Sequence, residues 1–154
     1  MLSLSQGTQI EEAKAMVENA ILDGSALNKF KEWLEIQGAD VSLINDSSKL
    51  LGAPILHEIK ASKSGYIVSL DAQKIGTVSM MLGAGRETKE QDVDFAVGIV
   101  LNKKIGDLVN PNDTLAYVHS NGKNTKVALE KVYEAYSFSD TVVKKQSKIL
   151  KVIK

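Results

Sequence analysis

The sequence VDFAVGIVLNKKIGDLVNPNDTLAYVH, residues 93–119, is the stretch from which the fold can be predicted most directly. Apolar side chains stand at every second position over residues 93–101, a spacing typical of a β-strand with one face on a core. Turn-forming residues follow at 102–104 and 110–113, and residues 115–118 have the composition of a returning strand. The stretch therefore predicts a compact β unit.

Two amphipathic helices are predicted near the start of the chain. Thr8 and Glu11 have the spacing of a capping box, in which both side chains accept hydrogen bonds from backbone amides at a helix start. Apolar residues at helical spacing follow, so we expect a helix over residues 9–22. Ser25 is then expected to cap a second helix, which Gly38 ends.

The connection between these helices consists only of Asp23 and Gly24, which predicts an antiparallel helical hairpin. The apolar faces of the hairpin need cover, either from each other or from a neighbouring domain. If a missing domain supplies it, we expect Phe30 and Trp33 to be partly exposed in this chain.

The spacing of apolar residues changes near residue 53, from a helical pattern to that of strands. Residues 39–55 mix apolar positions with turn formers, which indicates a short helical turn and a linker. We therefore expect two parts, residues 1–53 and residues 54–154. The second part is expected to be of the α+β class, because predicted strands and helices are mixed along it.

Strands in the second part are predicted over residues 55–61 and 66–70. Asp71 is expected to cap a helix that Gly83 ends. A glycine-started polar loop then covers residues 83–92, a length at which loops are often functional.

The chain beyond the β unit is expected to hold one more helix, capped by Asn124. Its apolar side is predicted to consist of four residues: Leu129, Val132, Tyr133 and Tyr136. Strands are predicted to finish the chain at residues 141–143 and 149–153.

The composition excludes several kinds of function. Nineteen basic residues balance nineteen acidic ones, so no global charge favours binding to nucleic acid or to an anionic membrane. The chain has no Cys and only two His residues, which removes disulfides, thiolate nucleophiles and most metal sites. No apolar run approaches the ~20 residues that span a bilayer, and no signal peptide is evident, so we expect a cytoplasmic protein.

Candidate chemical groups are few. His57 and His119 lie in strand patterns without an evident partner, so we interpret both as structural residues. Gly83, Gly85 and Arg86 could hold a phosphate, but the loop follows a helix and lacks the strand–loop–helix context of a P-loop. We expect an exposed loop there instead, and we assign no catalytic residue and no metal ligand.

Residues 106–109 and 112–115 resemble the paired turns of a biotinyl or lipoyl carrier domain. In such a carrier the modified residue would correspond to Lys103 or Lys104, but the Met-Lys-Met sequence of the biotin carriers is absent. A free-standing binding or carrier module of hammerhead shape is therefore the alternative function.

Five short segments together resemble the C-terminal domain of the pyrimidine-nucleoside and thymidine phosphorylases. In chain order they are Ser64-Gly65-Tyr66-Ile67, Ile75-Gly76, Leu82-Gly83-Ala84-Gly85-Arg86, Ala96-Val97-Gly98-Ile99 and Gly106-Asp107-Leu108-Val109. The resemblance implies an α/β-hammerhead-like domain, preceded by a helical hairpin that belongs to a central α/β domain.

The same resemblance implies an enzyme that cleaves pyrimidine nucleosides with inorganic phosphate, giving the base and a pentose 1-phosphate. In that family the residues that bind phosphate and base, and the contact of the homodimer, lie in parts that precede this chain. The expected partners are therefore those missing N-terminal domains and, in the parent enzyme, the nucleoside. Phosphate is a co-substrate, and no cofactor is implied for this chain. A loop of Gly83, Gly85, Arg86 and Glu87 is expected to help the domains close.

Overall fold

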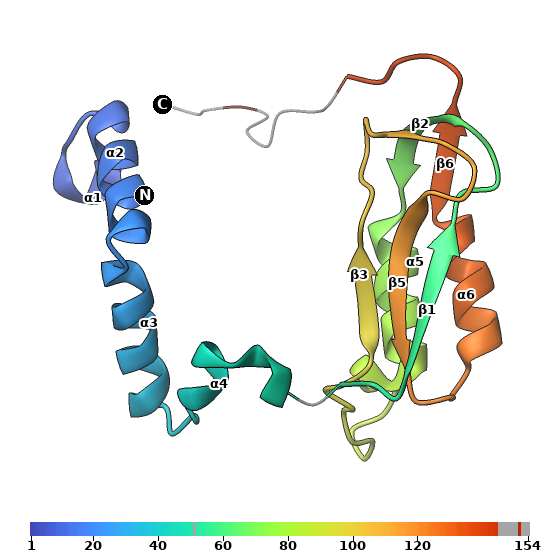
Figure 1. Ribbon diagram of the computed structural model, residues 1–154, viewed down its shortest axis with the longest axis horizontal. Coiled ribbons are helices and arrows are strands. Elements are labelled where there is room, and N and C mark those ends of the chain that lie inside the picture. Colours follow the sequence, from blue (N-terminus) through green and yellow to red (C-terminus); the bar gives the residue numbers. More distant parts are fainter. Residues whose placement is uncertain (51, 145–150, 152–154) are drawn as a thin grey trace. The chain divides into compact units, whose positions relative to one another are not determined.

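The computed structural model describes residues 1–50, 52–144 and 151 (Figure 1). The chain divides into two compact units, Met1–Leu50 and Leu51–Lys154. The membership of residues 1–53 in a neighbouring domain stays a prediction. No helix in the described residues is long and apolar enough to cross a membrane.

The first unit is entirely helical, as predicted. Its elements are α1 (Leu2–Gln6), α2 (Ile10–Leu22), α3 (Ser25–Ile36), α4 (Ser42–Asn45) and the 3-10 turn η1 (Ser47–Lys49). The capping box is wrong, because no side chain caps α2 and the buried Thr8 hydroxyl has no hydrogen-bond partner among the described residues. Ser25 does not cap α3 either; it is the first residue of that helix, and its amide donates to the carboxylate of Asp23 at 2.8 Å.

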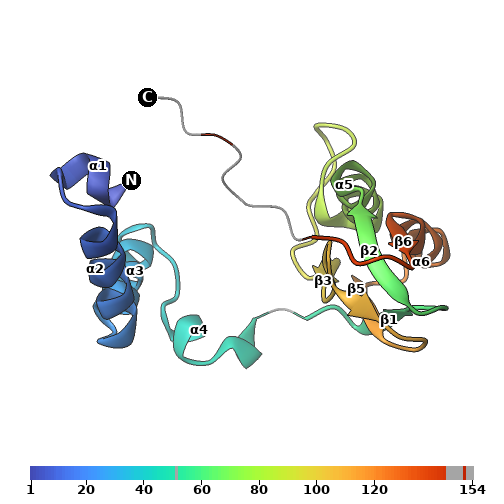
Figure 2. The same cartoon turned by 90° about the horizontal axis from the view of Figure 1, so that it is seen from above.

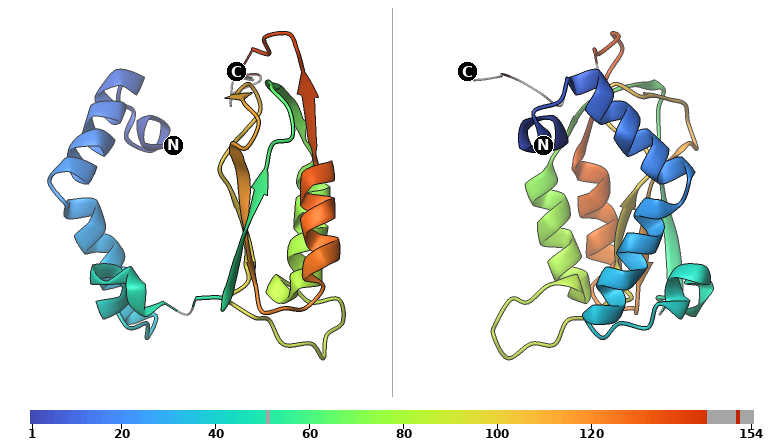
Figure 3. Two further views of the ribbon diagram at one scale, coloured as in Figure 1. Left: turned by 45° about the vertical axis from the view of Figure 1, so that its right-hand side comes forward. Right: turned by 90° about the vertical axis from the view of Figure 1, so that its left-hand side faces the viewer.

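The arrangement of α2 and α3 differs from the hairpin that we expected. Figures 1 and 3 show α3 running on from the end of α2 in a bent continuation, instead of folding back beside it. Asp23 keeps helical dihedral angles and only Gly24 is left-handed, at φ 78°. One left-handed residue redirects the helix without reversing it.

The apolar stripe of these helices is exposed within the chain, as expected for a face that packs elsewhere. Phe30 is 47% exposed and Trp33 is 55% exposed, and their rings stack at a centroid distance of 6.0 Å. Ala13 is the one buried apolar residue among the described residues of this unit.

The described residues of the second unit form two antiparallel sheets and two helices. One sheet has the order β1 (Ile55–Lys60), β5 (Thr114–Ser120), β3 (Gly98–Leu101), and the other has the order β4 (Leu108–Val109), β2 (Gly65–Leu70), β6 (Tyr136–Ser139). The helices are α5 (Ala72–Ser79), which continues into the π-helical segment η2 (Met80–Ala84), and α6 (Thr125–Glu134).

The core lies between the β1-β5-β3 sheet and the two helices. Figures 2 and 3 show α5 and α6 on one face of this sheet. Ile59 of β1 and Ala61, directly after the strand, are buried as predicted, and Val118 of β5 is fully buried. Asp71 caps α5 as predicted, accepting from the amide of Lys74 at 3.0 Å. The α+β class is confirmed.

The predicted strand over residues 93–101 is wrong in its first half, because β3 begins only at Gly98. Asp94 organises the preceding segment as a turn: its carboxylate accepts from the amide of Ala96 at 3.0 Å, and its own amide donates to the carbonyl of Gly83 at 2.9 Å. Phe95 is consequently 87% exposed, where the alternation predicts burial. The returning strand is confirmed as β5.

Other predictions for the end of the chain are either wrong or concern residues outside the described part of the chain. Asn124 precedes α6 with φ 53°, and its side chain makes no cap. Tyr136 lies in β6, not on the helix, and residues 141–143 form no strand. The strand predicted at 149–153 lies, except for Lys151, outside the described residues.

The paired turns of residues 104–107 and 110–113 share one geometry. In each, the carboxylate of the fourth residue accepts from the amide of the first, at 2.8 Å for Asp107 and 3.0 Å for Asp113. The third residue has a positive φ, 87° at Gly106 and 72° at Asn112, as a type II turn requires. The hammerhead assignment itself stays a prediction.

Burial of Tyr136 in the core makes the free energy of unfolding depend on pH. Its hydroxyl donates to the carbonyl of Leu115 at 3.0 Å, and burial raises its pKa from 10 to about 12. Because folding favours the neutral phenol, this contribution to stability is complete below about pH 10 and is lost as the pH rises towards 12. We therefore expect the free energy of unfolding, measured with urea between pH 9 and pH 11.5, to fall above pH 10.

The Tyr136→Phe variant should lose most of that fall, whereas Tyr117→Phe, on the outer face of the sheet, should retain it. An identical fall in wild type and Tyr136→Phe would contradict the assignment.

Candidate functional site

The loop that we expected to take part in domain closure follows η2 and projects from the end of the second unit at which β5 passes into α6 (Figure 1). Gly83 has φ 115°, so it ends the helical path as predicted, and Gly85 returns to an extended conformation at φ −149°. Arg86 and Glu87 follow, and both are exposed. The structure thus brings the four predicted residues together in one loop.

The tip of this loop is internally braced. The amide of Glu87 donates to the side-chain carbonyl of Gln91 at 2.8 Å, and the amide of Gln91 donates to the carbonyl of Thr88 at 3.3 Å. Arg86 makes no ion pair or side-chain hydrogen bond within the described part of the chain. The loop therefore presents a cation to solvent on a short, ordered turn.

The base of the loop is held by residues that sequence reasoning missed. Asp94 bonds to Gly83 across the base, and its second carboxylate oxygen accepts from the side-chain amide of Asn121 at 2.8 Å. The side-chain amide of Asn124 donates to the carbonyl of Met81 at 2.9 Å. The signal in the sequence is the Ser-Asn-Gly-Lys-Asn stretch at 120–124, a turn composition that is rich in side-chain amides.

A phosphate cradle within this loop is not supported by its geometry. The loop follows the C-terminal end of α5 and η2, where carbonyl groups carry the negative end of the helix dipole. An anion is favoured at the opposite end of a helix. The loop by itself therefore lacks the helix N-terminus that would favour an anion beside Arg86.

The two histidines do not form a site. In the sheet register His57 lies opposite Val118 and His119 lies opposite Leu56, so the two rings belong to opposite faces. The Nε2 atom of His57 is buried and has no hydrogen-bond partner among the described residues. Within those residues no group of three or more His, Asp or Glu side chains could hold a metal ion.

The lysines considered for a carrier function differ in their surroundings. Lys103 is only partly exposed, and its Nζ atom lies 3.7 Å from the carboxylate of Asp113. Lys104 is exposed and opens the turn that Asp107 closes.

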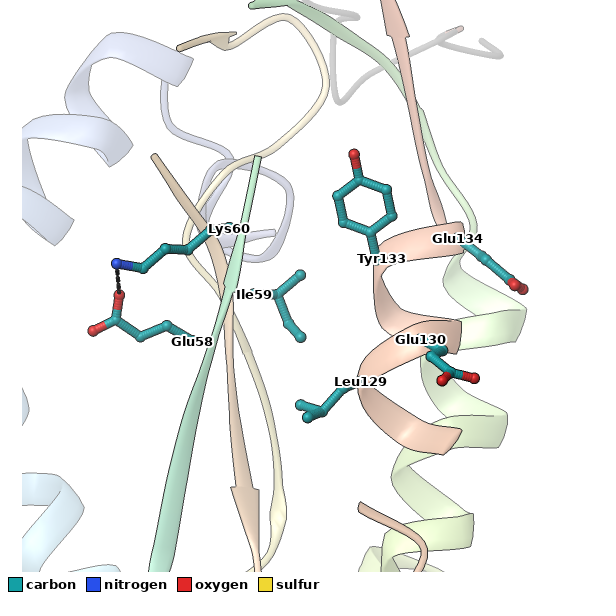
Figure 4. Close-up of a pocket in the computed structure, with 7 residues that line it drawn as sticks. All are labelled: Glu58, Ile59, Lys60, Leu129, Glu130, Tyr133 and Glu134. Atoms are coloured by element: carbon teal, nitrogen blue, oxygen red, sulfur yellow. Dashed lines mark ion pairs between the residues drawn. The ribbon is translucent and has the colours of Figure 1, made fainter. Parts of the chain in front are cut away.

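An open pocket of about 480 Å³ lies between β1 and α6 (Figure 4). Ile59 and Leu129 point towards each other across it, the ring of Tyr133 stands above them, and the Tyr133 hydroxyl bonds to that of Ser62. Glu58 and Lys60 point to the other side of the strand and pair with each other at 3.5 Å. The pocket thus has an apolar floor and no converging catalytic groups.

Gly83 offers a direct test of the loop base. A Cβ atom at Gly83 would meet only ordinary contacts, at 3.6 Å from Asp94 and 3.7 Å from Val97, so the penalty for alanine comes from its positive φ. Gly83→Ala should lower the free energy of unfolding by about 1–2 kcal/mol. Gly76→Ala, in helix α5 with open space around it, should raise it by about 0.5–1 kcal/mol. Equal effects of the two changes in urea unfolding would contradict this geometry.

Comparison with known proteins identifies the second unit. Residues 66–139 match the family described as the pyrimidine nucleoside phosphorylase C-terminal domain. This stretch begins in β2 and ends with β6, so it includes the loop and both helices described above.

Similarity to complete enzymes extends over most of the chain. It is 43% identical over 138 residues to the pyrimidine-nucleoside phosphorylase of Geobacillus stearothermophilus, covering 90% of this chain and 32% of that protein. It is 46% identical over 134 residues to the pyrimidine-nucleoside phosphorylase of Staphylococcus aureus (strain USA300), covering 87% of this chain and 31% of that protein. The chain thus spans about a third of the length of these relatives. It belongs to the pyrimidine-nucleoside phosphorylase family and corresponds to a C-terminal part of such an enzyme.

Proposed function

We propose that this chain acts as the C-terminal part of an enzyme that cleaves pyrimidine nucleosides with inorganic phosphate, giving the free base and a pentose 1-phosphate. The observation that carries the proposal is the identity of 43% and 46% to two pyrimidine-nucleoside phosphorylases over about nine tenths of the chain. Phosphate is then a co-substrate, and the nucleoside is a uridine or a thymidine.

We propose further that the chain has no phosphorolytic activity by itself. Phosphorolysis needs an anion cradle for phosphate and groups that orient the base, brought together when domains close. Support comes from the candidate groups described above: a single exposed arginine on a loop, two histidines on opposite faces, and an apolar pocket. The remaining groups are assigned to the part of the enzyme that precedes this chain.

In this proposal the exposed apolar face around Phe30 and Trp33 packs against that preceding part, which also forms the contact of a homodimer. Removal of these side chains from water supplies the association energy. The proposed location of the enzyme is the cytoplasm.

The proposed role of the loop is to complete the closed active site. Gly83 and Gly85 give its base an unusual path, and the braced turn carries Arg86 and Glu87 outward. A guanidinium that reaches a closing cleft stabilises phosphate or the developing negative charge on the base. Arg86 is the residue assigned to that contact.

The test compares phosphorolysis of uridine and of thymidine by four samples: the 154-residue chain, the complete enzyme that contains it, and the Arg86→Ala and Lys89→Ala variants of that enzyme. We expect activity only from the complete enzyme and its variants. Arg86→Ala should lower kcat/KM by about tenfold to a hundredfold, the range for one charge-assisted contact. Lys89→Ala, a matched change on the same exposed turn, should leave it unchanged.

Phosphorolysis by the 154-residue chain would contradict its proposed inactivity. A complete enzyme inactive on both nucleosides would contradict the proposed reaction, and unchanged kinetics for Arg86→Ala would remove that residue from the account.

A further inference from the structure

We propose that Asp94 and Asn121 form a clamp that positions the 85–93 loop, and that they are positioning residues for closure of the enzyme. The role in closure rests on the proposed function, whereas the clamp itself can be tested without any enzymatic assay. Neither residue touches the exposed tip that carries Arg86.

The clamp joins two segments that are distant in the chain. Asp94 lies just before β3, and Asn121 lies in the connection from β5 to α6. Besides the hydrogen bond between their side chains, each residue is fixed at a second point. The other carboxylate oxygen of Asp94 accepts from the amide of Ala96 at 3.0 Å, and the side-chain carbonyl of Asn121 accepts from the amide of Lys123 at 3.0 Å.

The two anchors attach the loop base to the rigid part of the unit. Ser120, directly before Asn121, is fully buried, and its hydroxyl bonds to the hydroxyl of Thr125 and to the amide of Gly122. The connection from β5 to α6 is therefore held in place by the core. Through Asn121 it holds Asp94, and through Asp94 it holds Gly83 at the other side of the loop base.

Two hydrogen bonds brace the tip over residues 87–91, and Arg86 lies between this tip and the base, so the position of the base affects where Arg86 lies. At the other end of the loop, Gly83 has φ 115° and Gly85 is extended at φ −149°, on either side of Ala84. A braced tip on a clamped base is the arrangement expected of a segment that must reach a defined position.

The polarity of the clamp allows a decisive experiment. Asp94→Asn would direct an amide N–H₂ group at the N–H₂ group of Asn121, since the carbonyl of each amide is already held by a backbone N–H. Asn121→Asp would set one carboxylate against another. The double variant Asp94→Asn/Asn121→Asp exchanges donor and acceptor between the two side chains. It keeps all three hydrogen bonds, because the carboxylate now at position 121 accepts from the backbone amide of Lys123 and from the side-chain amide now at position 94, whose carbonyl still accepts from the amide of Ala96.

Limited trypsin digestion of the 154-residue chain measures how readily the loop opens, through the rate of cleavage after Arg86 and Lys89. Cleavage after Lys131, within helix α6 between the buried residues Ala128 and Val132, serves as the reference for unfolding of the whole unit. Each single variant should raise the loop-to-reference cleavage ratio by about tenfold, the effect of one lost charge-assisted hydrogen bond. The double variant should return to within about twofold of wild type, and Asp92→Asn, an exposed neighbour, should match wild type.

The same variants of the complete enzyme then test the consequence for closure. We expect kcat/KM to fall in both single variants and to recover in the double variant, in parallel with the cleavage ratio. Single variants with a wild-type cleavage ratio, or a double variant that does not recover, would overturn the clamp. If the cleavage ratios behave as expected while kcat/KM stays unchanged in the complete enzyme, the clamp holds but its role in closure is overturned, and so is the role proposed for the loop. Loss of the proposed reaction is a separate outcome, shown by a complete enzyme that is inactive on both nucleosides.

Discussion

The carbonyl oxygen of Leu115 joins the two sheets of this protein. It accepts the amides of Asn102 and Lys103 at 2.9 Å, which bring the end of β3 back to β5, and the hydroxyl of Tyr136 at 3.0 Å, which attaches β6. A carbonyl has two lone pairs, so three donors on one buried oxygen saturate it completely. The second unit depends on this point, because β5 is the central strand of one sheet and Tyr136 begins an edge strand of the other.

The core of the second unit also holds the base of its exposed loop. The core of the second unit holds the connection from β5 to α6, and this connection in turn holds the base of the exposed loop through Asn121 and Asp94. The first unit is different: its helices leave Phe30 and Trp33 open to solvent. One unit thus carries its own core, and the other has an exposed apolar face, which in our proposal packs against a neighbouring domain.

Short sequence patterns correctly predicted those elements whose structure depends on residues close together in the chain. Asp71 caps its helix, Gly83 ends the helical path, and Ile59 of β1 is buried, because each depends on residues within one turn or one strand. The strand expected from residue 93 failed because Asp94 bonds to Gly83 and Asn121, partners that spacing along the chain does not reveal. Tyr136 continued the helical spacing of α6, but its bond to Leu115 belongs to the sheets. The loop residues were predicted, whereas the clamp beneath them depends on tertiary contacts and was not.

The most direct test of the account is hydrogen exchange of the backbone amides of residues 85–93 in the complete enzyme, with and without phosphate and a pyrimidine nucleoside analogue. Amides of the turn at residues 110–113 serve as the internal reference, since that turn follows β4 rather than the loop. We expect the two ligands together to slow exchange in the loop by about tenfold or more and to leave exchange in the reference turn unchanged. Equal exchange rates in the loop with and without both ligands would contradict its part in closure.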